Sequence, residues 1–281
     1  MNRYSFSGHE SFQCKALWLK KGYDFLVNGY SFKDVDSVVK LGVGKNMVAS
    51  IRFWLRAFGL SKDDELTKVA RYLFDSNIGR DPYSEDLNTL WLLHFLLINQ
   101  EVASLYHIVF LDYQRERKEF TRHELQTYIR RKCSIPEQRN VYNENTVKKD
   151  IGVLLKNYVS PKDLKKIEDF SALLLNLNLI VSKTNEIYNF REVTVKEIAP
   201  EIILFALICI GGKEKTISLD GLQRLSLIFC IPMMSFIEII RLLENTYPDA
   251  IVFSDNSGLK NVHIIKELDK FDILNKYYDS L

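Results

Sequence analysis

The segment from Ser7 to Cys14 combines three kinds of side chain that can bind a metal ion or form a nucleophile. His9, Glu10 and Cys14 lie within six residues, and imidazole, carboxylate and thiolate groups are all zinc ligands. A thiolate activated by a nearby histidine can also attack an electrophile. An ordinary structural interpretation is available, because Ser7 and Glu10 have the spacing of a capping box at the polar start of a helix. We favour this second interpretation, since such residues occur together by chance in many short windows.

Other catalytic signals are absent from the sequence. It contains no Walker loop, dinucleotide fingerprint, nucleophile elbow or HExxH motif, and the GVGK run at 42–45 lacks the spacing and the following Ser or Thr of a phosphate loop. The four cysteines are scattered without a CxxC pair, so we expect free thiols rather than a zinc ribbon or disulfides. We therefore predict a protein that is not an enzyme and carries no cofactor or metal.

Charge is segregated along a chain whose net charge is only +2. Residues 1–60 contain 9 basic and 4 acidic side chains, and residues 113–166 contain 14 basic and 7 acidic ones. The rest of the chain has 15 basic and 25 acidic side chains. Segregation of this kind can produce a basic face that binds a phosphate backbone, although solvated helix faces would give the same counts.

The order of elements in residues 35–58 is that of a helix-turn-helix. Helical spacing of apolar residues holds over 35–39, the LGVG run at 41–44 interrupts it, and the spacing resumes over 47–58. A helix, a turn with glycine and a longer helix make up a helix-turn-helix unit, although ordinary helical hairpins share this order.

The second helix of this unit should begin near Lys45. Docked in a major groove, it would expose Lys45, Asn46 and Ser50 near its first turn, while Arg52 and Arg56 would reach phosphates. Both alternatives, a groove-binding helix and a plain hairpin, stay open at this point.

The middle of the chain predicts core helices followed by a hairpin. Residues 90–96 are apolar almost all round, so we expect a central packing helix in which His94 is a core histidine. Thr121 and Glu124 have capping-box spacing, and a second helix start is expected at Asn145. Two strand-like runs, 179–182 and 186–190, are joined by residues 183–185. Helices followed by such a hairpin are typical of a winged helix.

The last third of the chain repeats this plan. Residues 198–212, 217–229 and 232–247 predict three helices, with Pro232 suited to the first turn of the third. Residues 250–265 alternate like two strands around a turn at 255–258. The fold class predicted is mainly α, with a helical helix-turn-helix-like domain at 1–112 and two winged-helix-like domains with small β-hairpins at 113–195 and 196–281.

Four segments together resemble a known family. They are SGHESF, CKALWLKKGYDF, KLGVGKNMVASIRFWLRAFGL and DPYSEDLNTLWLLHF, and they are similar to a prokaryotic family named domain of unknown function 4007. The resemblance spans most of the chain and is densest over residues 7–95. It implies an association with DNA phosphorothioation or phage-defence gene clusters, where members tend to be encoded beside sulfur-transfer enzymes. It offers no catalytic residues.

We expect a DNA-binding accessory or regulatory protein of a prokaryotic DNA-modification or phage-defence system, with double-stranded DNA as its partner. The chain begins without the basic-then-apolar order of a secretory signal and has no run of membrane-spanning length, so a cytoplasmic protein is expected. The predicted nucleic-acid-binding residues are Lys45, Asn46, Arg52, Arg56, Arg130, Arg131, Lys132, Asn145, Lys148 and Lys149.

Two alternatives remain. The first is a non-catalytic scaffold subunit that docks a partner enzyme through its winged-helix domains and the apolar helix segment at 233–236. The second is a metalloenzyme that uses His9, Glu10 and Cys14.

Overall fold

The computed structural model describes residues 3–161, 171–184, 186–212, 214–256 and 259–281. These residues are mainly helical, with short antiparallel sheets, so the predicted fold class is confirmed at that level. The chain divides into two compact units, Met1–Arg191 and Glu192–Leu281. The winged-helix assignments and the three predicted domains stay predictions.

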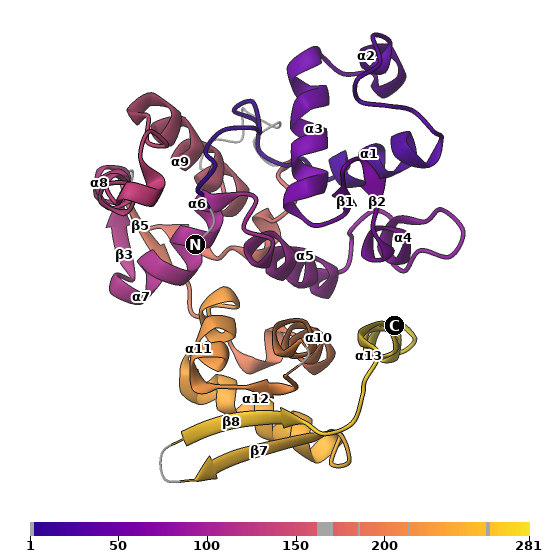
Figure 1. The fold of residues 1–281 in the computed structure, drawn as a ribbon, viewed down its shortest axis with the longest axis vertical. Helices are drawn as coiled ribbons and strands as arrows, with labels where there is room; N and C mark the ends of the chain where they lie inside the picture. The colour runs from indigo at the N-terminus through magenta and orange to yellow at the C-terminus, as the bar shows by residue number, and fades with distance from the viewer. Residues whose placement is uncertain (1–2, 162–170, 185, 213, 257–258) are drawn as a thin grey trace. The chain divides into compact units, whose positions relative to one another are not determined.

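Unit 1 begins with three helices and a small hairpin, which lie together in Figure 1. These elements are α1 (Trp18–Val27), α2 (Ser37–Leu41), α3 (Lys45–Ala57), β1 (Ser61–Lys62) and β2 (Glu65–Leu66). Gly42 ends α2 in the left-handed conformation, with φ of 61°, which glycine adopts without steric cost. The expected order of helix, glycine turn and longer helix is therefore present.

The rest of unit 1 is built around α5, whose residues from Thr89 to Ile98 are all buried. His94 is fully buried and shares a 2.8 Å hydrogen bond with the Tyr158 hydroxyl, which confirms a core histidine. A π-helix, η1, ends at Tyr113, which packs edge-on against Phe120. The remaining elements of unit 1 are α4 (Lys68–Phe74), α5 (Leu87–Asn99), α6 (Ser104–His107), η1 (Ile108–Tyr113), α7 (Gln114–Glu116), β3 (Glu119–Thr121), α8 (Arg122–Lys132), η2 (Pro136–Gln138), α9 (Glu144–Tyr158), η4 (Leu175–Leu177), β4 (Ile180–Ser182) and β5 (Ile187–Phe190).

The hairpin predicted in the middle of the chain is present as β4 and β5, which pair antiparallel. A third strand, β3, pairs with the other edge of β5 and gives the order β3-β5-β4. The capping box of Thr121 and Glu124 starts α8 as predicted. The next helix, α9, begins at Glu144, one residue before the start predicted at Asn145, and Asn143 caps it.

Unit 2 contains the three predicted helices, the predicted hairpin and a last helix. Its elements are η5 (Val195–Glu197), α10 (Pro200–Gly211), β6 (Thr216–Ile217), α11 (Leu219–Ile228), α12 (Met233–Thr246), β7 (Ile251–Asn256), β8 (Leu259–Ile264) and α13 (Lys270–Tyr278). The short strand β6 joins the hairpin in the order β6-β8-β7. Ser257 and Gly258 of the predicted turn, like Asn185 of the earlier one, lie outside the described residues.

Two predicted apolar surfaces differ from the structure. Val35 is fully exposed and Val39 is 81% exposed, so the segment before α3 does not bury the expected stripe. In α12, Phe236 is fully buried in the core of unit 2, whereas Met234 is exposed. The docking segment proposed at 233–236 is therefore smaller than the sequence indicated.

No single helix of the described part of the chain is both long and apolar enough to cross a membrane, although two sharply bent helix pairs reach that length and composition when each pair is taken together.

Candidate nucleic-acid interface

The outward face of α3 carries four of the predicted binding residues. Lys45, Asn46 and Arg56 are exposed, and no hydrogen-bond or ion-pair partner of their side chains is found among the described residues. Gly44 caps the helix without a side chain that could bond the first-turn amides, so no side chain of the cap residue satisfies these N–H groups at the positive end of the helix dipole. The arrangement suits an anion near the start of α3.

Arg52 is engaged by the neighbouring hairpin. Its Nε and Nη2 donate to the two oxygens of Asp64 at 2.8 and 2.7 Å, a bidentate geometry. Asp63 and Asp64 form the turn between β1 and β2 with positive φ values of 52° and 66°. A phosphate approaching Arg52 would compete with this carboxylate.

Ser50 is not exposed, contrary to the prediction. It is fully buried, and its hydroxyl donates to the carbonyl of His9 at 3.0 Å. The face of α3 that carries Ser50 therefore holds the N-terminal segment, and the binding face is limited to Lys45, Asn46 and the arginines.

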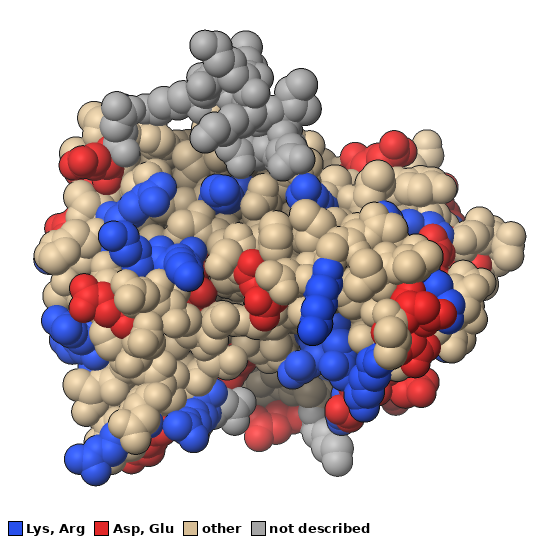
Figure 2. Space-filling view, turned by 90° about the horizontal axis from the view of Figure 1, so that it is seen from above, with Lys and Arg blue, Asp and Glu red and all other residues tan. Residues whose placement is uncertain are grey.

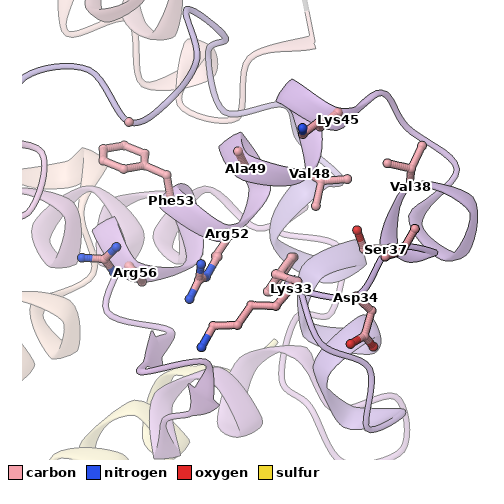
Figure 3. A pocket seen from close by; sticks show the side chains of 13 residues that line it. Lys33, Asp34, Ser37, Val38, Lys45, Val48, Ala49, Arg52, Phe53 and Arg56 are labelled. Carbon is pink, nitrogen blue, oxygen red and sulfur yellow. The ribbon is translucent and has the colours of Figure 1, made fainter.

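An open groove of about 630 Å³ lies between α3 and residues 32–38. Figure 3 shows the charged ends of Lys33, Arg52 and Arg56 directed into one part of this groove, while Lys45 lies at its other end. Lys33 was not among the predicted binding residues. Its place could not be derived from local spacing, because it lies before α2 and reaches the groove only through the fold.

The basic end of α8 is different, because each of its cations lies near a carboxylate. Arg131 Nη2 is 3.0 Å from Glu116, Lys132 Nζ is 2.8 Å from Asp112, and Arg130 Nη2 is 3.9 Å from Glu144. Exposed pairs of this kind contribute little to stability, so phosphates can displace them, but they lower the local positive potential.

The first turns of α9 carry the other predicted residues. Asn145, Lys148 and Lys149 are exposed, and no carboxylate of the described residues pairs with the two lysines. The same helix turns its Asp150 inward, where its side chain is 5% exposed. Two exposed lysines are thus followed directly by a buried acid in α9.

Asp150 binds the N-terminal segment. One of its oxygens accepts from the Ser7 amide at 2.7 Å, and the other lies 3.2 Å from His9 Nε2. His9 Nδ1 accepts from the Ser11 amide, which leaves Nε2 as the donor to the carboxylate. His9 also stacks on Trp54 of α3, with ring centroids 5.9 Å apart. The segment around His9 thus contacts both α3 and α9, and Figure 1 shows it running between them.

These contacts give the His9, Glu10 and Cys14 segment a structural explanation that differs from the predicted capping box. Ser7, Glu10 and Ser11 have positive φ values, so they form an irregular segment rather than a helix start, and α1 begins later at Trp18. Burial raises the pKa of the Cys14 thiol well above its usual range, which disfavours a thiolate. No His, Cys, Asp or Glu cluster that could hold a metal is found in the described ranges.

Figure 2 shows how Lys and Arg are distributed on one face of the molecule. Blue side chains gather in groups, and red and tan ones separate these groups and lie among them. We define the α3 cluster as Lys33, Lys45, Arg52 and Arg56, and the α9 cluster as Lys148 and Lys149 with the paired cations of α8. This division follows the helices that carry the predicted residues, which are α3 for one cluster and α8 and α9 for the other.

A family model described as Protein of unknown function (DUF4007) matches residues 6–278. The chain belongs to this family. The match covers nearly the whole chain and confirms the resemblance found in the sequence. No curated protein matches the chain.

Two solved structures are similar over almost the full length. A structure titled "SspB crystal structure" has a TM-score of 0.84 and 26% identity, covering 98% of this chain and 88% of that one. A second, titled "Magnesium ion-bound SspB crystal structure", has a TM-score of 0.83 with the same identity and coverage. The fold is thus shared with these two solved structures over almost the whole chain.

Proposed function

We propose that the chain is a DNA-binding accessory or regulatory protein of a prokaryotic DNA-modification or phage-defence system. The observation that carries the proposal is that four of the predicted cations are exposed and have no carboxylate partner among the described residues, namely Lys45 and Arg56 on α3 and Lys148 and Lys149 on α9. Unpaired Lys and Arg side chains on exposed helix faces are the groups that neutralise phosphates. The family association with modification and defence gene clusters supports DNA as the polyanion.

The number of phosphate contacts sets how steeply the binding constant falls with salt. If only these four replace counterions, the binding constant falls by roughly 150-fold between 50 and 200 mM salt. If the paired cations of α8 and Arg52 also reach phosphates, eight contacts are made and the fall is on the order of 10⁴-fold. A titration of a labelled duplex by fluorescence anisotropy at several salt concentrations distinguishes these cases.

Single substitutions then locate the interface. Arg56→Ala and Lys149→Ala should each weaken duplex binding and lower the magnitude of the salt slope by about 1. Lys118→Ala removes an exposed cation outside both clusters and should change neither quantity. Duplex binding that is absent at low salt, or equal effects of all three substitutions, would overturn the proposal.

The proposed role is non-catalytic, and the same duplex tests it with and without magnesium. One structural relative is described as magnesium ion-bound, so the incubation with magnesium is the more stringent test. An intact duplex after prolonged incubation with the protein and magnesium is expected. Strand cleavage that depends on the protein would replace the accessory role with a nuclease.

A scaffold subunit is the second candidate. It is favoured by the exposed apolar side chains of α12 in unit 2, where Met234 is 76% and Leu242 is 46% exposed. Contiguous exposed apolar surface marks protein interfaces. A scaffold predicts a stable complex with an enzyme encoded beside this protein and no salt-dependent binding of the isolated chain to DNA.

A further inference from the structure

The groove beside α3 has a chemical character that duplex phosphates do not require. Val48, Ala49 and Phe53 of α3 line one wall, and Val35 and Val38 line the other. Val35 is completely exposed there, with no apolar cover. Val48 and Phe53 are only 5% and 8% exposed, so the exposed apolar surface of the groove comes mainly from Ala49 and Val35. Contacts to duplex phosphates use charged and polar donors, so apolar side chains at this place indicate a ligand that also has an apolar surface.

The charge of the groove defines the rest of that ligand. Asp34 is the single carboxylate among its lining residues, and it accepts a hydrogen bond from the Ser31 amide at 3.3 Å. Figure 3 shows Asp34 on the α2 side, away from the charged ends of Lys33 and Arg56. Those two cations and Lys45 have no carboxylate partner within the described part of the chain. The groove therefore offers an excess of positive charge next to apolar side chains.

A nucleotide combines a flat, largely apolar base with a phosphate. Unpaired nucleotides are bound in proteins by contacts to the base faces together with Lys and Arg contacts to the backbone. The volume of about 630 Å³ lies within the range of small-molecule sites and is ample for one nucleotide. A base pair inside an intact duplex cannot enter such a groove, because its faces are stacked on its neighbours.

We propose that this groove binds one unpaired nucleotide, with its base against Val48, Ala49 and Phe53 and its phosphate at Lys33 and Arg56. The inference rests on the proposed DNA-binding function and specifies the form of nucleic acid that α3 prefers. The nucleotide could belong to a strand or be free in solution, and the experiment separates these two sources.

The test compares three probes: a matched duplex, the same duplex with one unpaired nucleotide at its centre, and a free deoxynucleoside monophosphate. The protein should bind the interrupted duplex about tenfold more tightly than the matched one, in line with the contribution of one stacked base. The free nucleotide at millimolar concentration should compete weakly, since it lacks the contacts of the flanking strand. Competition that fully abolishes the preference at micromolar concentration would assign the groove to a free nucleotide instead of a strand.

Two substitutions in the groove give independent readouts. Ala49→Leu places a branched side chain in the groove at an exposed helical position and should bring the ratio of the two dissociation constants close to one. Lys33→Ala should reduce the same ratio about threefold without altering any packed side chain. Lys118→Ala is the control and should leave the ratio unchanged. Tryptophan fluorescence of each variant checks that unit 1 is folded.

The outcomes separate this inference from the proposed function. Equal affinity of the native protein for matched and interrupted duplexes would overturn the unpaired-nucleotide site while leaving duplex binding intact. A preference that survives both Ala49→Leu and Lys33→Ala would place the site elsewhere and also overturn it. Loss of salt-dependent binding to every duplex would instead overturn the proposed function itself.

Discussion

Replacing Asp150 by Asn tests whether the N-terminal segment is held by a buried carboxylate. Asp150 accepts from Ser7 N–H at 2.7 Å and lies 3.2 Å from His9 Nε2. An asparagine keeps one oxygen acceptor and turns an NH₂ group toward the second donor. The loss of a buried hydrogen bond to a charged group should cost about 2–3 kcal/mol of the free energy of unfolding.

Urea unfolding followed by tryptophan fluorescence is the appropriate assay. The three tryptophans of the chain, Trp18, Trp54 and Trp91, all belong to unit 1, so the signal reports that unit alone. With an m-value of about 2 kcal/mol/M, the expected loss lowers the urea midpoint by about 1 M.

The matched control is Asp36→Asn. Asp36 also accepts from a cation, Lys40 at 2.8 Å, but its side chain is 56% exposed. An exposed pair of this kind contributes less than about 0.5 kcal/mol, so the midpoint should move by less than about 0.3 M. Equal midpoints for the two variants would refute the reasoning that burial makes the Asp150 contacts strong.

Three further predictions concern the same unit. Asp64→Asn removes the charge that holds the Arg52 guanidinium, and asparagine tolerates the positive φ at this position. The affinity for the matched duplex, measured by anisotropy, should therefore rise about threefold. Unchanged or weaker binding would contradict this. Burial raises the pKa of Tyr113 to about 12, so the neutral phenol is favoured in the folded state, and the free energy of unfolding should fall as the pH rises from 10 to 12. Tyr113→Phe should reduce this pH-dependent fall in stability. At neutral pH the variant should be at least as stable as the native protein, because the buried hydroxyl has no hydrogen-bond partner in the described structure. A marked loss of stability would show that the hydroxyl is satisfied. Gly8→Ala should lower the urea midpoint, because Gly8 has a φ of 96° and a Cβ there would lie 2.7 Å from a ring carbon of Phe53. Gly152→Ala should raise the midpoint, because a Cβ at this position of α9 meets open space and alanine favours the helix.

Local patterns in the sequence were sufficient for much of the helical fold. The nearly continuous apolar run of α5 predicted a buried helix, and the spacing of Thr121 and Glu124 predicted the start of α8, because both signals lie within a few residues. The additional strand of each three-stranded sheet, β3 or β6, was not predicted. Both β3 and β6 are only two or three residues long, and their hydrogen-bond partners lie far along the chain.

The candidate site was less predictable than the fold. Residue type identified the cations of α3 and α9, but it did not show that Arg52 and Arg131 have carboxylate partners. Ser50 is buried because its hydroxyl bonds the backbone of His9. His9 and Ser7 in turn both bind Asp150 of α9, which lies 143 residues after Ser7 in the sequence. Such partners are set by tertiary packing, which local spacing does not encode.

The segment around His9 also determines how the two basic clusters act together. It is attached to α3 through Ser50 and Trp54 and to α9 through Asp150, so it holds the two helices at one separation. A polyanion long enough to span that separation binds the second cluster at a high effective concentration once it has bound the first, and a shorter one does not. Affinity should therefore rise steeply at one threshold of duplex length, and that threshold is a measure of the distance between the clusters.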